Sequence, residues 1–368
     1  MTVGSPVKRI LVLWADDASP NLGVRVLGRG TAALAHRVWP NAEIVYQNYG
    51  HRAPELPFGR LRSLAKERFT GRLGMQRWLA GFDLAIDTRS GDSFADIYGL
   101  RRLVVMSAVA DLASRAGVPV VLGPQTIGPF TTRRGRWLAR RSLGRASAIM
   151  ARDSDSAEYS AKLGHPVNVL TTDVVFALPE PDVGEVRDVI LNISGLLWAP
   201  NPHVDSVRYR QTIIRLFDAL VAAGRTVTLL AHVLESDNPD SDVSAIREFA
   251  RDHAPDVEVL IPSGLDEVRT ALLGASVVIA SRMHACLNAL SVGTPAVPLA
   301  YSRKFDPLLR GLGWNHTVDL RHDTDPVGAV LAVLAVLADP SVPTNVTAVI
   351  LRAQETLTLA EDALRRIG

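Results

Sequence analysis

Short runs of β-branched and aliphatic residues alternate with helical patterns along almost the whole chain, and this alternation restricts the folds that are open to it. In the first half, runs typical of buried strands occupy residues 9–15, 42–48, 82–87, 118–124, 148–153 and 167–173. In the second half they occupy residues 189–195, 225–233, 257–262, 275–281 and 294–301. Strands that alternate with helices form parallel sheets with helices on both faces. The sequence therefore predicts an α/β fold.

A segment rich in Pro, Glu and Asp near residues 178–188 separates the two series of strands. At 368 residues the chain exceeds one typical core, and each series has the length of a domain. We therefore expect two Rossmann-like domains that face each other across a cleft. Their expected bounds are residues 1–180 and 187–340, followed by a C-terminal helix at 341–368.

Composition excludes several classes of protein. Hydrophobic residues make up 47% and charged residues 21%, and the net charge of +2 gives no signature of nucleic-acid binding. The single cysteine, Cys286, excludes an internal disulfide framework, and its apolar helical surroundings favour a small core residue over a reactive thiol. No apolar run reaches the roughly 20 residues of a membrane-spanning helix. We expect a cytoplasmic protein.

Polar residues that follow the predicted strands are the candidates for a site, because ligands of open parallel sheets bind beyond the carboxyl ends of the strands. The apolar run 275–280 is followed by Ser281, Arg282 and His284, and His284 opens a helical pattern. A helix N-terminus offers free N–H groups and a positive dipole end to an anion. Lys304 follows the next predicted strand. We expect these cations to converge on one anion site; the alternative is a capping histidine with Arg282 and Lys304 in solvent.

The first half carries further cationic and amide candidates. Gln125 lies in a loop that contains Gly and Pro, and its amide can hydrogen-bond a sugar. Arg133 and Arg134 begin an arginine-rich helix, and Arg152 ends a predicted strand. Arg152 fits an ion pair as well as it fits anion binding. The arginine-rich helix is either a solvated charged face or a surface for peripheral contact with the inner face of the cell membrane.

Acidic residues close two of the strands in the first half. Asp16 and Asp17 follow the first strand, and Asn21 lies a few residues further on; these groups can bind the hydroxyls of a sugar acceptor. Asp92 follows the third strand, where it is either a helix N-cap or an acceptor ligand. No set of His, Asp and Glu has the spacing of a metal site, so we expect no metal.

Three segments resemble the polysaccharide pyruvyl transferase family: "GPQTIGPF", "ARDSDS" and "SRMHACLNALSVGTPAVPLAYSRKF". The resemblance runs from about Leu11 to Lys304, and it implies a GT-B-like, two-domain architecture. It also implies transfer of pyruvate from phosphoenolpyruvate to two hydroxyls of a sugar in a cell-surface glycan or glycolipid precursor. The products are a cyclic pyruvate ketal and phosphate. Phosphoenolpyruvate is then a co-substrate, and no cofactor is expected.

The resemblance also implies roles for individual residues. His284 matches the catalytic histidine and Lys304 a lysine that contacts phosphoenolpyruvate. One arginine of the first domain completes the anion site, and the candidates are Arg133, Arg134 and Arg152. The chain departs from the family at Val24, where many members carry an aspartate after Asn-x-Gly.

The chemistry of this transfer suits the residues. Phosphoenolpyruvate carries close to three negative charges, which several cations must balance. A protonated histidine can donate a proton to the methylene carbon and then accept one from a sugar hydroxyl. Two other functions stay open. One is a GT-B glycosyltransferase with a nucleotide-sugar donor, in which Asn288 replaces the usual ribose-binding glutamate. The other is a non-enzymatic protein that binds sugars or anions.

Overall fold

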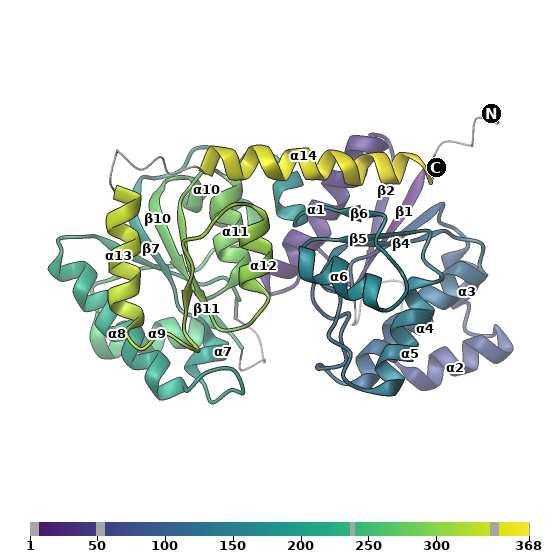
Figure 1. Ribbon diagram of the computed structural model, residues 1–368, viewed down its shortest axis with the longest axis horizontal. Coiled ribbons are helices and arrows are strands. Elements are labelled where there is room, and N and C mark those ends of the chain that lie inside the picture. Colours follow the sequence, from purple (N-terminus) through teal and green to yellow (C-terminus); the bar gives the residue numbers. More distant parts are fainter. Residues whose placement is uncertain (1–6, 49–55, 236–239, 339–345, 368) are drawn as a thin grey trace. The chain divides into compact units, whose positions relative to one another are not determined.

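The computed structural model describes residues 7–48, 56–235, 240–338 and 346–367, and the chain divides into two compact units (Figure 1). Unit 1 comprises Met1–Ala18, Val24–Leu178 and Ala353–Gly368, and unit 2 comprises Ser19–Gly23 and Pro179–Arg352. Two helices, α1 (Leu22–Val38) and α14 (Val346–Arg365), therefore contain residues of both units.

Unit 1 is built on a parallel sheet of six strands in the order β2-β1-β3-β4-β5-β6. The strands are β1 (Arg9–Leu13), β2 (Glu43–Gln47), β3 (Leu84–Asp87), β4 (Val120–Gln125), β5 (Ala148–Ala151) and β6 (Val169–Leu170). Besides α1 and α14, its helices are α2 (Leu61–Thr70), α3 (Met75–Leu79), α4 (Leu100–Arg115), α5 (Arg133–Leu143), α6 (Ser154–Lys162) and the 3₁₀ turn η1 (Val174–Ala177). All residues of β3, β4 and β5 are buried, as expected for strands covered on both faces.

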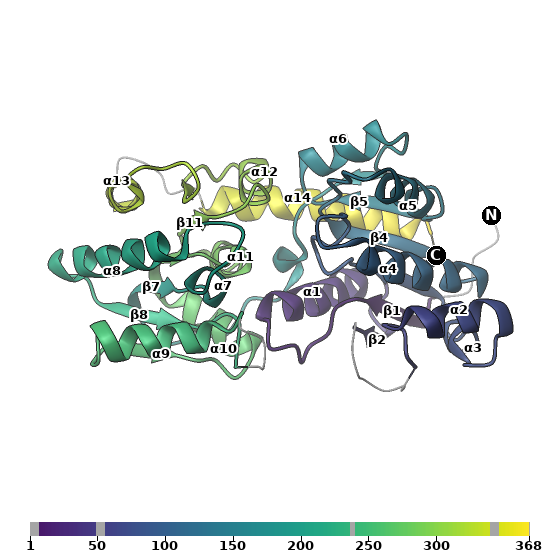
Figure 2. The same ribbon diagram turned by 90° about the horizontal axis from the view of Figure 1, so that it is seen from below.

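Unit 2 contains a second parallel sheet of six strands in the order β12-β11-β10-β7-β8-β9, the arrangement of a dinucleotide-binding Rossmann sheet. The strands are β7 (Arg187–Asn192), β8 (Val227–Leu230), β9 (Glu258–Leu260), β10 (Ala275–Ala280), β11 (Ala296–Ala300) and β12 (Val318–Asp319). Its helices are α7 (Gly195–Trp198), α8 (Ser206–Ala222), α9 (Asp242–His253), α10 (Leu265–Leu273), α11 (Met283–Ser291), α12 (Phe305–Gly311) and α13 (Pro326–Ala338). Figure 2 shows helices packed around the strands of each unit.

The α/β fold with two Rossmann-like sheets, predicted from the alternation of strands and helices, is confirmed. Every predicted run overlaps an observed strand, and α14 lies within the segment 341–368 where a terminal helix is expected. The short edge strand β12 is absent from the prediction because its two residues produce no apolar run. Cys286 is fully buried in α11, so the interpretation as a core residue is confirmed, and burial raises the pKa of its thiol.

Candidate functional site

The strand order of unit 2 identifies where a ligand site belongs. Strands β8 and β9 follow on one side of β7, and β10, β11 and β12 follow on its other side, so the strand order reverses between β7 and β10. Open α/β sheets bind ligands beyond the carboxyl ends of the strands at such a switch point. Ser281 and Arg282 follow β10, and His284 lies in the first turn of α11. Lys304 follows β11, the parallel neighbour of β10. The predicted residues of unit 2 thus share one edge of one sheet.

The imidazole of His284 packs against a glycine from a distant part of the sequence. The segment Ser19–Gly23 belongs to unit 2, where the Leu22 N–H donates to the His232 carbonyl at 3.1 Å. A Cβ atom on Gly23 would lie only 2.8 Å from Nδ1 of His284. Real Cβ contacts are longer than this, so the bare backbone of Gly23 leaves the space that the ring occupies. Asn21, which was predicted to bind the sugar substrate, accepts a hydrogen bond through its side-chain oxygen from the Gly23 N–H at 2.9 Å.

A second histidine lies close to His284. His232 is fully buried, and burial, followed by the charges of His284 and Arg282, lowers its pKa well below the ordinary value. Its Nε2 lies 3.3 Å from the amide nitrogen of Asn288, and that nitrogen donates to the His284 carbonyl at 2.8 Å. The other end of the Asn288 amide accepts from Arg269 at 3.1 Å. The neutral imidazole of His232 and the buried amide of Asn288 therefore support the first turn of α11.

Lys304 lies in a small group of aromatic and charged side chains. Its ammonium is 5.9 Å from the ring centroid of Tyr301, and the ring of Tyr301 lies edge-on to that of His203 at 5.2 Å. Burial and then the positive charge of Lys304 lower the pKa of His203, whereas the carboxylate of Asp240 raises it. An anion bound beside Lys304 would offset the effect of the ammonium and favour a protonated His203.

Arg282 does not present its charge to a ligand. Its guanidinium pairs with Asp242 at 2.8 Å and with Asp240 at 2.7 Å, and the residue is 7% exposed. Although burial opposes it, the two carboxylates raise the pKa of Arg282 above its ordinary value. The expectation of a cation free to hold phosphoenolpyruvate overlooked these two aspartates, which compensate the charge inside the protein.

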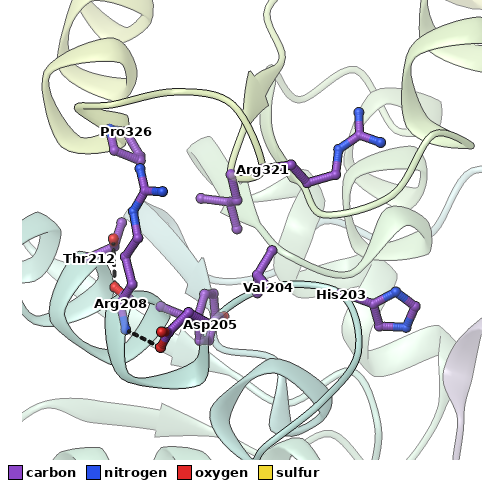
Figure 3. Close-up of a pocket in the computed structure, with 9 residues that line it drawn as sticks. His203, Val204, Asp205, Arg208, Thr212, Arg321 and Pro326 are labelled. Carbon is purple, nitrogen blue, oxygen red and sulfur yellow. Dashed lines mark hydrogen bonds between the residues drawn. The ribbon is translucent and has the colours of Figure 1, made fainter.

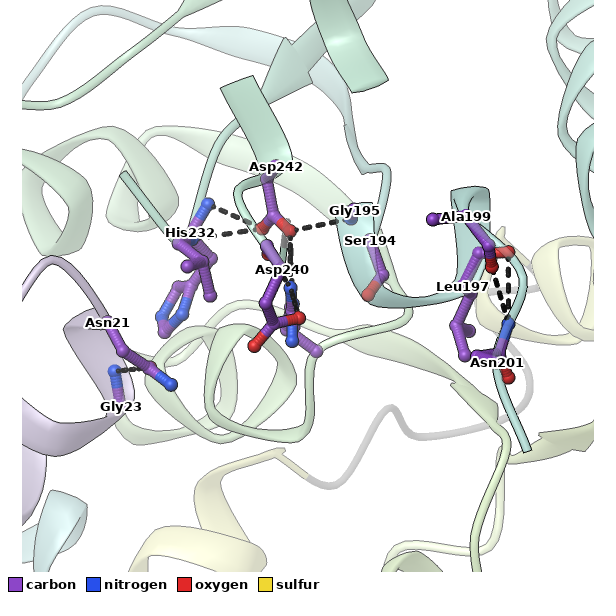
Figure 4. Close-up of polar contacts among 12 residues, drawn as sticks. Asn21, Gly23, Ser194, Gly195, Leu197, Ala199, Asn201, His232, Asp240 and Asp242 are labelled. Carbon is purple, nitrogen blue, oxygen red and sulfur yellow. Dashed lines mark hydrogen bonds and ion pairs between the residues drawn. The ribbon is translucent and has the colours of Figure 1, made fainter. Parts of the chain in front are cut away.

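Asp242 is the centre of a buried hydrogen-bond network that joins three strand ends (Figure 4). The carboxylate is fully buried and accepts hydrogen bonds from the backbone N–H groups of Gly195, His232 and Val233 and from the side chains of Asn192 and Arg282. Asn192 in turn accepts from the Arg282 N–H at 3.0 Å. A buried carboxylate with this many donors is well stabilised. The network fixes the backbone from which α11 begins.

Ser281 also has an internal partner. Its hydroxyl lies 2.8 Å from the hydroxyl of Tyr209, and both side chains are buried. The Tyr209 hydroxyl also accepts from the Ser194 N–H at 3.0 Å. These contacts connect the ends of β7 and β10, so the Ser281 hydroxyl has a structural role where a substrate contact was predicted.

A pocket of about 250 Å³ lies in unit 2, between the start of α8 and the connection from β12 to α13 (Figure 3). It is lined by His203, Val204, Asp205, Arg208, Tyr209, Thr212, Leu320, Arg321 and Pro326. Asp205 caps α8 by accepting from two backbone N–H groups. In the described part of the chain, the lining residues include none of the predicted site residues, but His203 connects the pocket with Tyr301 and Lys304.

The acidic candidates of unit 1 differ in their surroundings. Asp16 is 6% exposed and accepts hydrogen bonds from the Ala18 N–H and from Asn48 at 2.7 Å. Asp17 is exposed. Asp92 accepts from the Tyr98 hydroxyl at 3.0 Å, and because α4 begins only at Leu100, Asp92 is not the cap of that helix.

The switch point of the unit 1 sheet lies between β1 and β3, and the backbone there is strained. Trp14, after β1, and Arg89 and Ser90, after β3, have φ angles of 66°, 47° and 49°, values that non-glycine residues seldom adopt. The Ser90 hydroxyl donates to the Trp14 carbonyl at 3.0 Å. Such strain concentrates at functional sites. It makes this edge the candidate for a second binding surface.

Gln125 and the arginines of unit 1 fall into two groups. Gln125, the last residue of β4, is fully buried, and neither amide atom has a hydrogen-bond partner among the described residues. Arg152 is 2% exposed and pairs with Asp173 at 2.7 Å, which corresponds to the ion-pair alternative. Arg133 and Arg134 are exposed in the first turn of α5. Among the described residues, no cluster of three or more His, Cys, Asp or Glu side chains could hold a metal ion.

Three participants were missed by sequence reasoning. Asp242 lies outside the predicted strands, Gly23 contacts His284 from more than 250 residues away, and His203 follows a short helix. The only local signal is the pair Asp240 and Asp242 shortly after a predicted strand, which parallels Asp16 and Asp17 in the first half.

Solved structures define the class of fold. The chain is similar to a UDP-N-acetylglucosamine 2-epimerase from Listeria monocytogenes described as putative in that structure, with a TM-score of 0.59, 12% identity and coverage of 98% of this chain and 95% of that one. It is similar to HepE of Anabaena, solved with UDP and glucose, with a TM-score of 0.55, 11% identity and coverage of 98% of each chain. O-GlcNAc transferase from Thermobaculum terrenum matches with a TM-score of 0.51, 16% identity and coverage of 99% and 68%. These similarities define a GT-B-like fold.

The sequence identifies the family within that fold. The profile of the polysaccharide pyruvyl transferase family matches residues 21–303, which is most of the chain. The protein belongs to the polysaccharide pyruvyl transferase family.

Proposed function

We propose that this protein transfers pyruvate from phosphoenolpyruvate to two hydroxyls of a sugar in a glycan or glycolipid precursor. Family membership supports a pyruvyl transferase that acts on a polysaccharide or its precursor. The observation that carries the proposal is the place of His284 at the switch point of unit 2, with Lys304 at the end of the adjacent strand.

In the proposed reaction His284 is the acid and then the base. Its imidazolium donates a proton to the methylene carbon of phosphoenolpyruvate, and the neighbouring carbon becomes an oxocarbenium-like centre. A sugar hydroxyl attacks this centre and loses its proton to the imidazole. The second hydroxyl displaces inorganic phosphate, which leaves with the remaining proton, and the ring closes. Proton transfer by such a group typically contributes 10²- to 10⁴-fold in rate.

Lys304 is the cation that we assign to the donor in unit 2. An ammonium suits phosphate as a point charge. Arg282 contributes through position instead, because its charge is compensated by Asp240 and Asp242. Lys304→Gln should therefore raise KM for phosphoenolpyruvate at least tenfold. Arg282 could not take over the role of Lys304, because its charge is already compensated by two aspartates.

We place the sugar acceptor on unit 1, at the strained edge beside β1 and β3. Asp16, Asp17, Asp92 and Gln125 remain the candidate ligands there. The amide of Gln125 is the most informative of these, because a buried amide without partners carries a free-energy cost that a ligand hydroxyl could relieve.

The glycosyltransferase alternative has less support. In that reading Asn288 stands where a glutamate binds ribose, but Asn288 is fully buried and its amide bonds to His284, His232 and Arg269. Both N–H groups of the amide are used inside the protein and its oxygen is buried, so the side chain does not present an acceptor to a nucleotide ribose.

The experiment that tests the function measures two products. Incubation of the protein with phosphoenolpyruvate and a panel of glycosides should release inorganic phosphate and add a pyruvate ketal to one of them. His284→Ala should lose both products, whereas the exposed His253→Ala should keep both. Release of a nucleotide from a sugar nucleotide, with no phosphate from phosphoenolpyruvate, would exclude the proposal.

A further inference from the structure

The outer face of α5 carries exposed side chains beyond those that the roles of His284 and Lys304 require. Gly135, Ala139, Ser142 and Leu143 are the buried residues of this helix. At about 3.6 residues per turn, Trp137 lies on the opposite side, and it is 61% exposed. A large aromatic side chain therefore lies on the solvent-facing side of this helix.

Cations surround this tryptophan. Arg133, Arg140 and Arg141 lie three or four residues from it along the helix, so they flank the indole on the same face. The guanidinium of Arg141 lies 5.8 Å from the ring centroid of Trp137. The helix contains five arginines and no acidic residue. We define Arg133, Arg134, Trp137 and Arg140 as the α5 face.

The charges of the α5 face are largely uncompensated. Asp111 pairs with Arg141 at 2.8 Å and with Arg145 at 2.7 Å, on one flank of the helix. Arg133 and Arg134 are exposed, and neither makes a hydrogen bond or ion pair with the described residues. The acidic residue nearest the helix start, Asp96, is occupied by hydrogen bonds from the residues that precede α5.

Further apolar groups continue the surface beside the start of α5. The Asp96 carboxylate accepts from the N–H groups of Thr131 and Thr132 at 2.8 Å each. This anchor holds the following residues, Ile97 and Tyr98, next to the first helical turn, and they are 56% and 43% exposed. The result is an exposed surface with aromatic and aliphatic side chains among arginines.

We propose that the α5 face docks the protein on an anionic lipid bilayer. Tryptophan and tyrosine favour the interface between water and lipid, and arginines bind lipid phosphates. Exposed side chains on a helix face suit a flat membrane better than they suit a small soluble anion, which binds in a concave site. In the described residues, no helix has the length and apolar character to cross a membrane, so the contact is peripheral.

Vesicle sedimentation tests the proposal without any enzyme assay. The whole protein should sediment with vesicles of mixed phosphatidylcholine and phosphatidylglycerol, and remain in solution with phosphatidylcholine alone. Salt should weaken the binding, because the charges are exposed to solvent. Arg133→Glu/Arg140→Glu should reduce the affinity at least about tenfold, since each cation near an anionic surface contributes measurably. Trp137→Ala should reduce it as well.

Matched variants distinguish vesicle binding through the α5 face from a general effect of net charge or of any exposed aromatic ring. Arg215→Glu/Arg247→Glu makes the same change in net charge on exposed arginines of α8 and α9 in unit 2. Phe69→Ala removes an aromatic ring that is 85% exposed on α2. Both controls should bind vesicles like the unaltered protein. Equal loss in a control and in the α5 variants would overturn the proposal. So would binding to soluble polyphosphate through these arginines without binding to anionic vesicles.

Discussion

At the scale of single residues, the contact between Gly23 and His284 is the closest constraint on the proposed catalytic group. Gly23 lies within α1, in a helical backbone that alanine also adopts, so the absent Cβ is explained by the imidazole and not by the main-chain angles. The proposed acid/base thus depends on a residue from the opposite end of the chain.

Gly23→Ala should displace the imidazole while the helix keeps its backbone. We expect kcat to fall about 10- to 100-fold, because small misplacements of a catalytic group have effects of this size. The midpoint of thermal unfolding should change little, because two effects on stability oppose each other. The new Cβ is crowded by the imidazole, whereas alanine favours a helix by up to about 1 kcal/mol over glycine. Gly311→Ala in α12 is the control, since a Cβ there meets open space. An unchanged kcat in Gly23→Ala would show that His284 does not need this contact.

The buried pair of Arg282 and Asp242 should dominate the stability of unit 2. Asp242→Asn removes the fully buried one of the two charges that compensate the Arg282 guanidinium, and breaking a buried pair typically costs about 3–5 kcal/mol of unfolding free energy. Asp306→Asn breaks the exposed pair with Arg310, and its effect should stay below about 1 kcal/mol. Denaturant unfolding of the two variants measures both values, and equal losses would contradict the account of the network.

His232 should make stability depend on pH. Its folded-state pKa lies below that of the unfolded chain, so the unfolded state takes up a proton first as the pH falls. The stability that comes from the neutral imidazole is therefore complete above about pH 6.5 and is lost progressively below it. Comparing the unfolding free energy of the protein and of His232→Gln between neutral and mildly acidic pH tests this. The variant should show the shallower slope; parallel slopes would mean that another group is responsible.

At the scale of elements, the strands were readable because each is a short apolar run between polar turns. The rule that ligands bind at strand ends also brought Ser281, Arg282, His284 and Lys304 to one edge of a sheet. The direction in which a side chain points was not readable. Arg282 and Ser281 face buried partners, Asp242 and Tyr209, that come from other elements.

Contacts between residues that are far apart in the sequence explain why Asn21 and its neighbours lie elsewhere than expected. The segment Ser19–Gly23 follows the first strand of unit 1 in sequence, yet it packs in unit 2 through an antiparallel bridge between Asn21 and Val233. No local pattern carries this information. The expectation that Asn21 binds the acceptor came from its neighbours in sequence, whereas the structure places it beside His232 and His284.

At the scale of the whole molecule, the chain joins a Rossmann sheet that carries His284 and Lys304 to a second sheet with a strained switch point. Members of the polysaccharide pyruvyl transferase family share this matched region, and the GT-B-like fold is common to proteins with other activities. The fold is therefore compatible with several reactions, and the proposed chemistry rests on the residues at the strand ends.

The most direct test of the proposed function uses phosphoenolpyruvate labelled with ¹³C in its carbon skeleton. Incubated with the protein and an acceptor sugar, the label should appear in the sugar as a ketal carbon bonded to two oxygens and a methyl group. One phosphate should be released for each ketal formed, and His284→Ala should give neither. Label that never enters any sugar, together with glycosyl transfer from a nucleotide sugar, would contradict the account.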